Sequence, residues 1–547
     1  MSQVATPEAV HGDFAATGLR FDGVEYRVAR RGDTFWVGLP TPQGPRWEQV
    51  VQTTGSHAMQ VYWYATGEGR TLDPFPLVYL LDEGRWIPRN AAFLRPPALQ
   101  SAPPSESSRW NRTCVLCHAT HPQSRMRSFD TADTQVAELG IACEACHGPG
   151  EEHARQNHDP TRRYAEYFSP RPDPTIQNPA RLEAARSAEV CGQCHAVFYS
   201  KSQEDYRRDL ELGPGYRPGQ VLADSRHVVR CAEDPEQAAP LDRTLADMFP
   251  GYMERRFWSD GAIRVGGREY NALLESPCFQ GGELSCVSCH ELHPRPDDPR
   301  PLAEWADDQL QRGGRGDASC VACHAEVAAQ GEAHTFHPVD SAGSACMNCH
   351  MPHTTYALLK AIRSHTVDSP RVATELRTGR PNACNLCHLD RSLGWAADAL
   401  TERWGQPRPE LDATQEEVPA GVRWLTTGDA GVRALAAWSL GWAPAQEASG
   451  RGWIPGYLAE ALDDPYVAVR LVGARSLRSF PGLSPAGYDP LGGPEARRAA
   501  VAALRAAWRR DVPAPGPGFP HDAQGEFTPR YAELLELRDL RPVDLVE

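Results

Sequence analysis

The sequence predicts a multidomain chain with a small β-rich domain over residues 1–105, a loop-rich region of short helices over 106–400, and an all-α domain over 401–547. Three observations predict this order. The first hundred residues lack cysteine and contain short β-like runs between turns. Fourteen of the 16 cysteines then recur in one short motif, and beyond it the composition shifts to Ala, Leu, Arg and Trp. A chain of 547 residues is also longer than one hydrophobic core usually supports.

Four runs rich in β-branched and aromatic residues predict strands in the N-terminal domain. They are Val24–Ala29, Thr34–Leu39, Val61–Tyr64 and Leu77–Leu81. Gly32-Asp33 and Glu83-Gly84 predict turns beside them. The polar, Pro/Ser-rich stretch Pro96–Ser108 predicts a linker, which sets the first boundary near residue 105.

The middle region repeats the pattern Cys-x-x-Cys-His seven times. The paired cysteines are Cys114 and Cys117, Cys143 and Cys146, Cys191 and Cys194, Cys286 and Cys289, Cys320 and Cys323, Cys346 and Cys349, and Cys384 and Cys387. The histidines that follow them are His118, His147, His195, His290, His324, His350 and His388.

This motif supplies the three groups that a covalently attached haem needs. Its thiols can form thioethers with the two vinyl groups of one porphyrin, and its histidine can ligate the iron from that face. Zinc ribbons also use Cys-x-x-Cys pairs, but zinc gives no reason for a histidine after every second cysteine. The sequence therefore predicts seven haem c groups, with the motif histidines as proximal iron ligands.

Seven haems would leave roughly 40 residues for each, fewer than an independent core needs. We expect the porphyrins to form much of the interior, with little regular secondary structure and a short helix starting at each motif. The longest gap, from His195 to Cys286, predicts a haem-free insertion at about residues 200–280. The predicted middle region is thus a multihaem cytochrome c core.

Twelve further histidines could fill the second axial position of an iron. Three motifs continue to another histidine three residues on, which cannot reach around its own haem but could ligate a neighbouring one. His153 follows a Gly-Pro-Gly turn that could send its imidazole to another iron. The distal candidates are His57, His121, His153, His293, His334, His337, His353 and His365, whereas His11, His158, His227 and His521 are more typical of solvated histidines.

The C-terminal region contains an internal repeat. Val432-Arg433-x-x-Ala436-Ala437-x-Ser439-Leu440 recurs 37 residues later as Val469-Arg470-x-x-Gly473-Ala474-x-Ser476-Leu477. Asp429 and Asp464 precede these segments as expected helix N-caps, and residues 497–510 predict another helix. The pattern resembles HEAT-type repeats in a short α-solenoid, and an unrelated helical tail is the alternative.

Charge and hydropathy exclude some classes of function. The net charge of -15 argues against a nucleic-acid partner, which would need a basic face. No stretch reaches the 18 or so apolar residues of a membrane helix.

Haem is normally attached to this motif outside the cytoplasmic membrane, so we expect a periplasmic or extracellular protein. Its export signal would have been removed, or the start misassigned. In an oxidising compartment Cys231 and Cys278 could form a disulfide, and the sequence leaves that open.

Three segments carry a family resemblance: Gly140-Ile-Ala-Cys-Glu-Ala-Cys-His-Gly-Pro-Gly, Cys346-Met-Asn-Cys-His-Met-Pro-His and Pro381-Asn-Ala-Cys-Asn-Leu-Cys-His. Over about residues 50–405 the chain resembles multihaem cytochromes related to the tetrahaem electron carrier of ammonia oxidation, hydroxylamine oxidoreductase and pentahaem nitrite reductase. The resemblance implies distal ligation by His153, His293 and His353. It departs from the enzymes, because neither Lys201 nor Lys360 replaces a motif histidine and no catalytic tyrosine can be matched.

We expect an electron-transfer protein with mostly bis-histidine haems that exchanges electrons with redox partner proteins and offers its helical tail as a docking surface. The alternative is an oxidoreductase that binds a small nitrogen or sulfur oxyanion at one five-coordinate haem. A structural or haem-storage protein is a third reading. The number of irons without a protein sixth ligand distinguishes the first two.

Overall fold

The computed structural model describes residues 2–21, 23–66, 69–100, 109–128, 130–483 and 487–546. The chain forms two compact units. Unit 1 comprises Met1–Arg89, Ser101–Val229 and Cys278–Gln311, and unit 2 comprises Asn90–Gln100, Arg230–Pro277 and Arg312–Glu547. Unit 1 therefore carries the first four motifs, and unit 2 carries the last three together with the helical tail.

These units cut across the expected segments. The expected insertion is divided, with residues 200–229 in unit 1 and 230–277 in unit 2. Most of the expected linker, residues 101–108, lies outside the described residues, as does the boundary near residue 105. The expected domain boundaries stay predictions.

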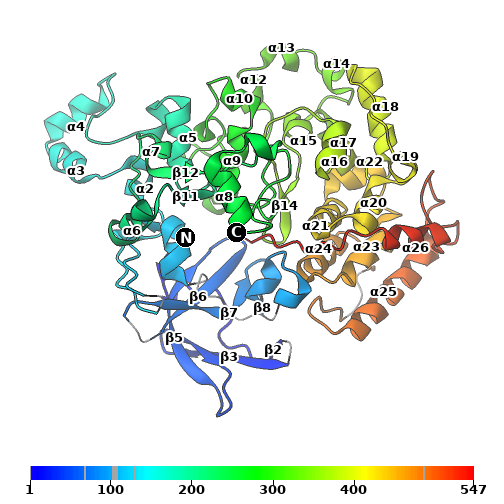
Figure 1. Cartoon of the computed structure of the whole chain (residues 1–547), viewed down its shortest axis with the longest axis horizontal. Helices are drawn as coiled ribbons and strands as arrows, with labels where there is room; N and C mark the ends of the chain where they lie inside the picture. The colour runs from blue at the N-terminus through cyan, green and yellow to red at the C-terminus, as the bar shows by residue number, and fades with distance from the viewer. Residues whose placement is uncertain are drawn as a thin grey trace. The chain divides into compact units, whose positions relative to one another are not determined.

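Unit 1 begins with an antiparallel sheet whose strands follow one another in the order β2 to β8, while β1 pairs with β5 (Figure 1, blue). The strands are β1 (Ser2–Val4), β2 (Leu19–Phe21), β3 (Val24–Arg31), β4 (Thr34–Leu39), β5 (Arg46–Thr54), β6 (Met59–Ala65), β7 (Leu72–Leu80) and β8 (Arg85–Pro88).

The sheet confirms the four expected strands and buries a core of Val37, Tyr62, Phe75 and Leu77. The turn between β3 and β4 needs glycine, since Gly32 has a φ of 62°.

The motif region of unit 1 contains short helices and two small two-stranded sheets, β9 with β10 and β11 with β12. Its α-helices are α1 (Val115–His118), α2 (Cys143–His147), α3 (Glu151–Asn157), α4 (Pro160–Tyr167), α5 (Ala184–Gly192), α6 (Gln203–Leu212), α7 (Leu222–Ser225) and α11 (Leu302–Asp308). Its strands are β9 (Ala119–Thr120), β10 (Glu138–Leu139), β11 (Phe198–Ser200) and β12 (Arg226–Val228). Helix α10 (Pro277–Gln280) lies where the chain returns to unit 1.

The part of unit 2 before the helical tail contains similarly short helices. They are α8 (Pro240–Met248), α9 (Glu269–Leu274), α12 (Ala318–Val321), α13 (Ala325–Ala328), α14 (Glu332–Thr335), α15 (Cys346–His350), α16 (Val372–Thr378) and α17 (Ala383–Cys387), with the strand pair β13 (Thr355–Ala357) and β14 (Lys360–Ile362). The expected short helices are present at or across several motifs, and two of them, α2 and α15, begin at the first motif cysteine.

The C-terminal part of unit 2 is helical, as expected. It comprises α18 (Leu393–Trp404), α19 (Ala413–Glu417), α20 (Ala420–Thr427), α21 (Ala430–Ser439), α22 (Ala443–Ser449), α23 (Ile454–Leu462), α24 (Val467–Leu477), α25 (Pro494–Trp508) and α26 (Pro529–Glu536). Helix α21 packs against α20 and α24, and α23 packs against α24 and α25. The paired stacking agrees with a solenoid, while assignment to the HEAT class stays a prediction.

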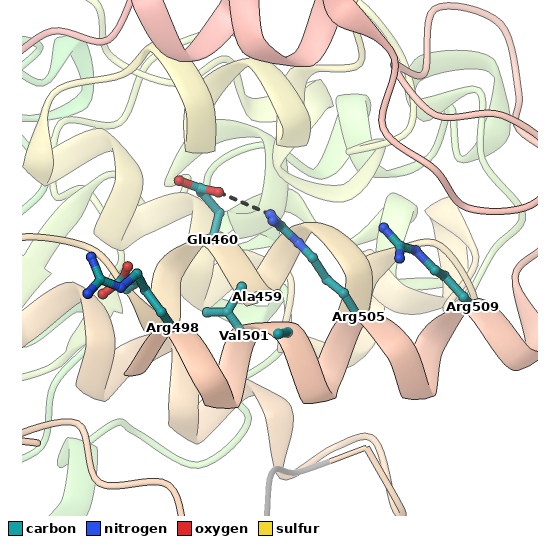
Figure 2. Close-up of a pocket in the computed structure, with 8 residues that line it drawn as sticks. Ala459, Glu460, Arg498, Val501, Arg505 and Arg509 are labelled. Atoms are coloured by element: carbon teal, nitrogen blue, oxygen red, sulfur yellow. Dashed lines mark hydrogen bonds and ion pairs between the residues drawn. The ribbon is translucent and has the colours of Figure 1, made fainter. Parts of the chain in front are cut away.

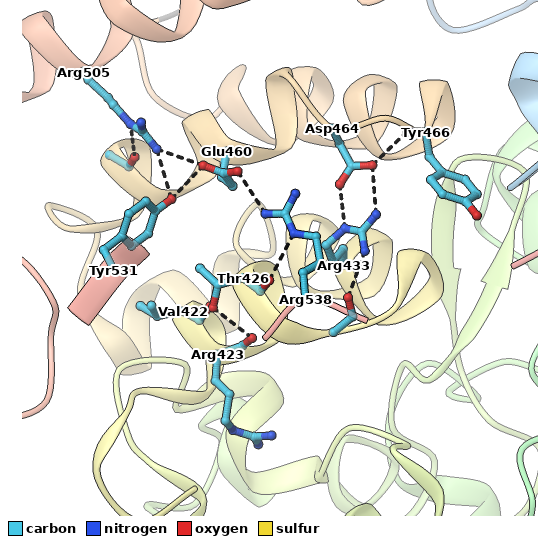
Figure 3. Close-up of polar contacts among 12 residues, drawn as sticks. Val422, Arg423, Thr426, Arg433, Glu460, Asp464, Tyr466, Arg505, Tyr531 and Arg538 are labelled. Carbon is cyan, nitrogen blue, oxygen red and sulfur yellow. Dashed lines mark hydrogen bonds and ion pairs between the residues drawn. The ribbon is translucent and has the colours of Figure 1, made fainter. Parts of the chain in front are cut away.

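The repeated arginines lie inside the helical tail. Arg433, which is 2% exposed, donates to both carboxylate oxygens of Asp464 at 2.6 and 3.1 Å (Figure 3). Arg470, its counterpart 37 residues on, donates to the carbonyls of Asp464 and Pro490 at 2.6 Å each. The repeat therefore places one buried cation in each copy, and both bind Asp464: Arg433 through its carboxylate and Arg470 through its carbonyl.

The N-cap expectation is right for one copy and wrong for the other. Asp429 caps α21 by accepting a hydrogen bond from the backbone N–H of Val432 at 3.0 Å. Helix α24 is capped at Tyr466 instead. Asp464 lies two residues earlier, because the 37-residue offset carries position 429 to 466, and its carboxylate binds Arg433.

The tail is joined to the rest of unit 2 by a largely buried ion pair. Arg264 donates to both oxygens of Asp429 at 2.6 and 2.5 Å, and both side chains are about 10% exposed. The carboxylate that caps α21 thus also binds a residue of the segment between the third and fourth motifs. Among the helices in the described parts of the chain, none combines the length and apolar character needed to cross a membrane.

Candidate haem-binding sites

Two histidine rings of unit 1 lie close together. His147, the histidine of the second motif, lies with its ring centroid 6.1 Å from that of His293, and the ring planes differ by 29°. His147 ends helix α2, and His293 follows the fourth motif by three residues. The structure thus brings a proximal candidate to a distal candidate that is distant in sequence.

Unit 2 contains two further pairs of the same kind. His350 of the sixth motif has its ring centroid 6.3 Å from that of His334, with planes 6° apart. His388 of the seventh motif has its centroid 6.0 Å from that of His337, with planes 28° apart. Each pair again joins a motif histidine to a distal candidate.

These separations fit an iron between two imidazoles. An imidazole nitrogen binds a first-row metal at about 2 Å and lies about 1 Å from its own ring centre, so opposed ligands have ring centres about 6 Å apart. The observed values of 6.0 to 6.3 Å agree with this requirement.

Hydrogen bonds at Nδ1 fix the orientation of several of these rings. His147 Nδ1 lies 2.7 Å from the carbonyl oxygen of Gln177, and His350 Nδ1 lies 2.8 Å from that of Asp368. His290 makes the same contact with Asp308 at 3.1 Å, and His337 with Thr335 at 2.6 Å. A ring that donates from Nδ1 keeps Nε2 as the unprotonated nitrogen, which is the tautomer that metal ligation needs.

Burial changes the acid–base chemistry of the motif cysteines. It raises the pKa of the Cys114 and Cys146 thiols to about 11 and that of Cys384 and Cys387 to about 12. These thiols therefore stay protonated at neutral pH. An apolar porphyrin edge suits such surroundings better than a charged ligand does.

The motifs of unit 1 lie close together. The thiol of Cys117 lies 3.7 Å from the carbonyl oxygen of Cys194, which joins the first motif to the third. Gln193 of the third motif donates to the carbonyl of Ala145 in the second at 2.8 Å. A side-chain hydrogen bond links Cys191 with Cys286 of the fourth motif and raises the pKa of Cys191 far above its ordinary value. The four motifs form one connected cluster.

The motifs of unit 2 are linked in the same way. Asp317, beside the fifth motif, accepts a hydrogen bond from the backbone N–H of Cys346 at 2.9 Å. Helix α15 of the sixth motif packs against α17 of the seventh. Arg363, which follows β14, donates to the carbonyl of Met347 and the side chain of Asn348, both at 2.8 Å, and thereby holds the sixth motif in place.

His353 is buried against tryptophans of the helical tail. Its ring centroid lies 4.7 Å from that of Trp438 and 4.9 Å from that of Trp442. Burial, with a smaller effect of Arg363, lowers its pKa to about 3. Burial and the neighbouring His337 lower the pKa of His388 to about 4. Both imidazoles are neutral at physiological pH, as iron ligands must be.

The other distal candidates occupy varied places. His57 is exposed between β5 and β6 with Nδ1 2.9 Å from the Ser56 hydroxyl. His121 has a positive φ of 45°, and burial followed by Arg217 lowers its pKa. His365 Nδ1 lies 3.3 Å from the carbonyl of Arg363. His153 Nδ1 lies 2.9 Å from Oδ2 of Asp173.

The other motif histidines also have defined positions. His118 ends α1, His195 follows α5, and His324 is the N-cap of α13. Cys231 and Cys278 are free thiols that lie in different units.

Sequence reasoning missed the groups that hold these histidines. The carbonyl acceptors of His290 and His350 both belong to an aspartate 18 residues further along the chain. Trp395, Trp438 and Trp442 contact His388 or His353. The common 18-residue spacing is the one signal that could have revealed part of this shell.

Comparison with known proteins agrees with this chemistry. Residues 97–148, which contain the first two motifs, match the family model described as cytochrome c554 and c-prime. The match supports a c-type cytochrome. Together with the repeated motif it supports an electron-transfer protein with several covalently bound haems.

The crystal structure of the outer cell wall cytochrome OcwA aligns with 84% of this chain and 88% of that chain, at 17% sequence identity and a TM-score of 0.38. This TM-score is too low to establish a common fold. No curated protein matches the sequence significantly.

Proposed function

We propose that the chain is a heptahaem c-type cytochrome that transfers electrons between redox partner proteins outside the cytoplasm. The observation that carries this proposal is the set of three imidazole pairs with centroids 6.0 to 6.3 Å apart. Each pair combines a histidine of the haem-attachment motif with one from outside it. Chance packing gives no reason for this repeated combination.

Each of the three histidine pairs would give one iron two axial nitrogen ligands. In this proposal His293 serves the haem of His147, His334 that of His350, and His337 that of His388. Bound haem supplies one-electron chemistry through its iron. Because protein fills both axial positions, these sites accept and release electrons without binding a substrate.

The contacts between motifs support transfer within each unit. In unit 1 they connect the first, second and fourth motifs through the third. In unit 2 they connect the fifth with the sixth, and the sixth with the seventh. Porphyrins attached at adjoining motifs would lie close enough for an electron to pass between neighbours.

The chemistry of haem attachment supports a periplasmic or extracellular location. Thioether bonds to Cys-x-x-Cys-His are normally formed after export, in a compartment where the cytoplasmic thiol pool is absent. All seven motifs of this chain require that step.

The helical tail is the proposed docking surface for a redox partner. Arg498 and Arg505 of α25, with Arg509 just after its end, line an open pocket of about 470 Å³ that also contains Glu460 of α23 (Figure 2). Glu460 accepts from Arg505 at 3.1 Å, and Asp463, the second acidic residue of the lining, pairs with Arg497 of α25 at 2.9 Å. Three guanidinium groups against two carboxylates leave the lining with a net positive charge, which favours a partner with an acidic surface.

The spin state of the irons tests the proposed function. We would record the electron paramagnetic resonance spectrum of the oxidised protein and then add carbon monoxide after reduction. We expect low-spin irons throughout and no carbon monoxide adduct. A high-spin iron that binds carbon monoxide would contradict the carrier function and favour an oxidoreductase acting on a small nitrogen or sulfur oxyanion at a five-coordinate haem.

A further inference from the structure

The guanidinium group of Arg363 binds the sixth motif at three points. Its Nη1 donates to the carbonyl oxygens of Met347 at 2.8 Å and Met351 at 3.2 Å, and its Nη2 donates to the side-chain oxygen of Asn348 at 2.8 Å. Each of these residues is the sequence neighbour of one residue that is predicted to attach or ligate a haem: Cys346, Cys349 and His350. One side chain thus holds the whole attachment turn.

These contacts do not neutralise the positive charge of Arg363. All three acceptors are uncharged oxygens, and in the described part of the chain no carboxylate forms an ion pair with Arg363. The side chain is partly buried, and burial lowers its pKa from the ordinary 12.5. A guanidinium group nevertheless stays protonated at neutral pH. A full positive charge therefore lies against the sixth motif.

Arg380, a second arginine near this motif, is paired in the ordinary way. It is 5% exposed and donates to the carboxylates of Asp260 and Asp368, both at 2.9 Å. Asp368 is also the residue whose carbonyl oxygen lies 2.8 Å from His350 Nδ1. The carboxylate next to that carbonyl is thus bound to a cation of its own and does not compensate Arg363.

Asp317 acts on the same motif with the opposite sign. Its carboxylate accepts from the backbone N–H of Cys346 at 2.9 Å, and after burial it is the next cause that raises the pKa of the Cys346 and Cys349 thiols. Arg363 extends its own effect beyond the atoms it binds, because it adds to burial in lowering the pKa of His353. The electrostatic potential at the sixth motif therefore depends on both side chains.

We propose that Arg363 is a positioning residue that holds the sixth motif and raises the reduction potential of the haem between His334 and His350. Ferrous iron carries one positive charge fewer than ferric iron, so a nearby cation stabilises the reduced state. This inference rests on the proposed function, and it identifies the haem by the ring pair whose centroids lie 6.3 Å apart. The charge makes this haem a better electron acceptor than its two imidazole ligands alone would.

The test is a redox titration of the purified haem-loaded protein, followed optically, for the wild type and Arg363→Gln. Glutamine keeps an N–H donor for the motif but removes the charge. We expect one component of the titration to move to lower potential while the haem content stays the same. If Arg363→Gln does not load its full haem content, Arg363→Met replaces it and the same shift is expected. An unchanged titration would overturn the inference.

Two further variants separate the charge from its alternatives. Lys360→Gln is the matched control, because Lys360 is exposed at the start of β14, three residues before Arg363, and its loss removes the same charge from the same segment. An equal shift in Lys360→Gln would show a general charge effect and contradict a specific role of Arg363. Arg363→Lys keeps the charge without the planar fork, and we expect it to restore the wild-type potential. A shift in Arg363→Lys as large as that in Arg363→Gln would contradict the role of the charge.

A His334→Ala background identifies the haem and separates this inference from the proposed function. In that background the iron bound to His350 should be high-spin and have an absorption band of its own, so its potential can be followed separately. We expect Arg363→Gln to lower the potential of that band, and a shift confined to the low-spin haems would contradict the assignment. If His334→Ala leaves every iron low-spin, the ligand pair of the proposed function fails, while the titration without His334→Ala still decides whether Arg363 raises a potential.

Discussion

His334 and His350 have ring centroids 6.3 Å apart and ring planes that differ by only 6°. His334 belongs to α14, and His350 ends α15, the helix of the sixth motif. The Nδ1 atom of His350 is 2.8 Å from the carbonyl oxygen of Asp368, and this hydrogen bond sets the orientation of the His350 ring. The pair thus has the features on which the proposed bis-histidine sites depend: a motif histidine, a second histidine from outside the motif, and a hydrogen bond at Nδ1 that orients the ring.

Replacing His334 by alanine should open one axial position. We expect one haem per molecule to become high-spin and to bind carbon monoxide when reduced, because no second imidazole would face His350. Optical and electron paramagnetic resonance spectra of the purified variant measure both effects. His158→Ala is the control, since His158 is exposed at the end of α3, and it should leave the spectra unchanged. Equal spectra for the two variants would rule out His334 as a ligand.

Asp429 should stabilise the helical tail more than an ordinary N-cap does. Its loss removes the cap of α21 and leaves Arg264 without its buried carboxylate, so we expect Asp429→Ala to cost about 3 kcal/mol. Asp412 caps α19 at an exposed position, and Asp412→Ala should cost about 1 kcal/mol. Urea unfolding followed by circular dichroism compares the two. Equal costs would contradict a stabilising role for the Arg264 pair.

Glu460 should make the stability of the tail depend on pH. Burial would raise its pKa, but Arg538 and Arg505 outweigh burial and hold the pKa below the ordinary 4.5. Tyr531 adds a hydrogen bond at 2.8 Å (Figure 3). A carboxyl whose folded pKa is depressed contributes stability above its unfolded pKa and loses it as pH falls through the folded value.

We therefore expect Glu460→Gln to lower the free energy of unfolding by about 3 kcal/mol at pH 7, with the difference shrinking below pH 4.5. Glu526→Gln is the control, because Glu526 pairs with Arg509 at 2.8 Å on the surface and should have an effect under about 1 kcal/mol. Unfolding curves across pH 3 to 8 measure both. A difference for Glu460→Gln that does not vary with pH would contradict the account.

Local patterns allowed part of the fold to be predicted. Alternating β-branched and aromatic residues predicted β4 with its correct bounds, whereas β5 was missed because Glu48, Gln49 and Gln52 interrupt its apolar pattern. The tail repeat predicted helices, and counting its 37-residue offset from Asp429 would have led to Tyr466 rather than Asp464 as the second N-cap.

The candidate sites show where sequence reasoning stops. The motif identifies the proximal histidine because attachment and ligation are local. The distal partner of His147 is His293, which the tertiary structure brings from beyond two further motifs. The contact of His153 with Asp173 could not be predicted either, since it depends on a loop that folds back onto α3.

The number of haems per chain tests the central claim most directly. We would determine it from the intact mass of the matured protein, measured under denaturing conditions so that covalently bound groups alone remain. The account predicts a mass increase equal to seven haems, one for each Cys-x-x-Cys-His motif. A smaller increase, with free thiols remaining at one or more motifs, would contradict it.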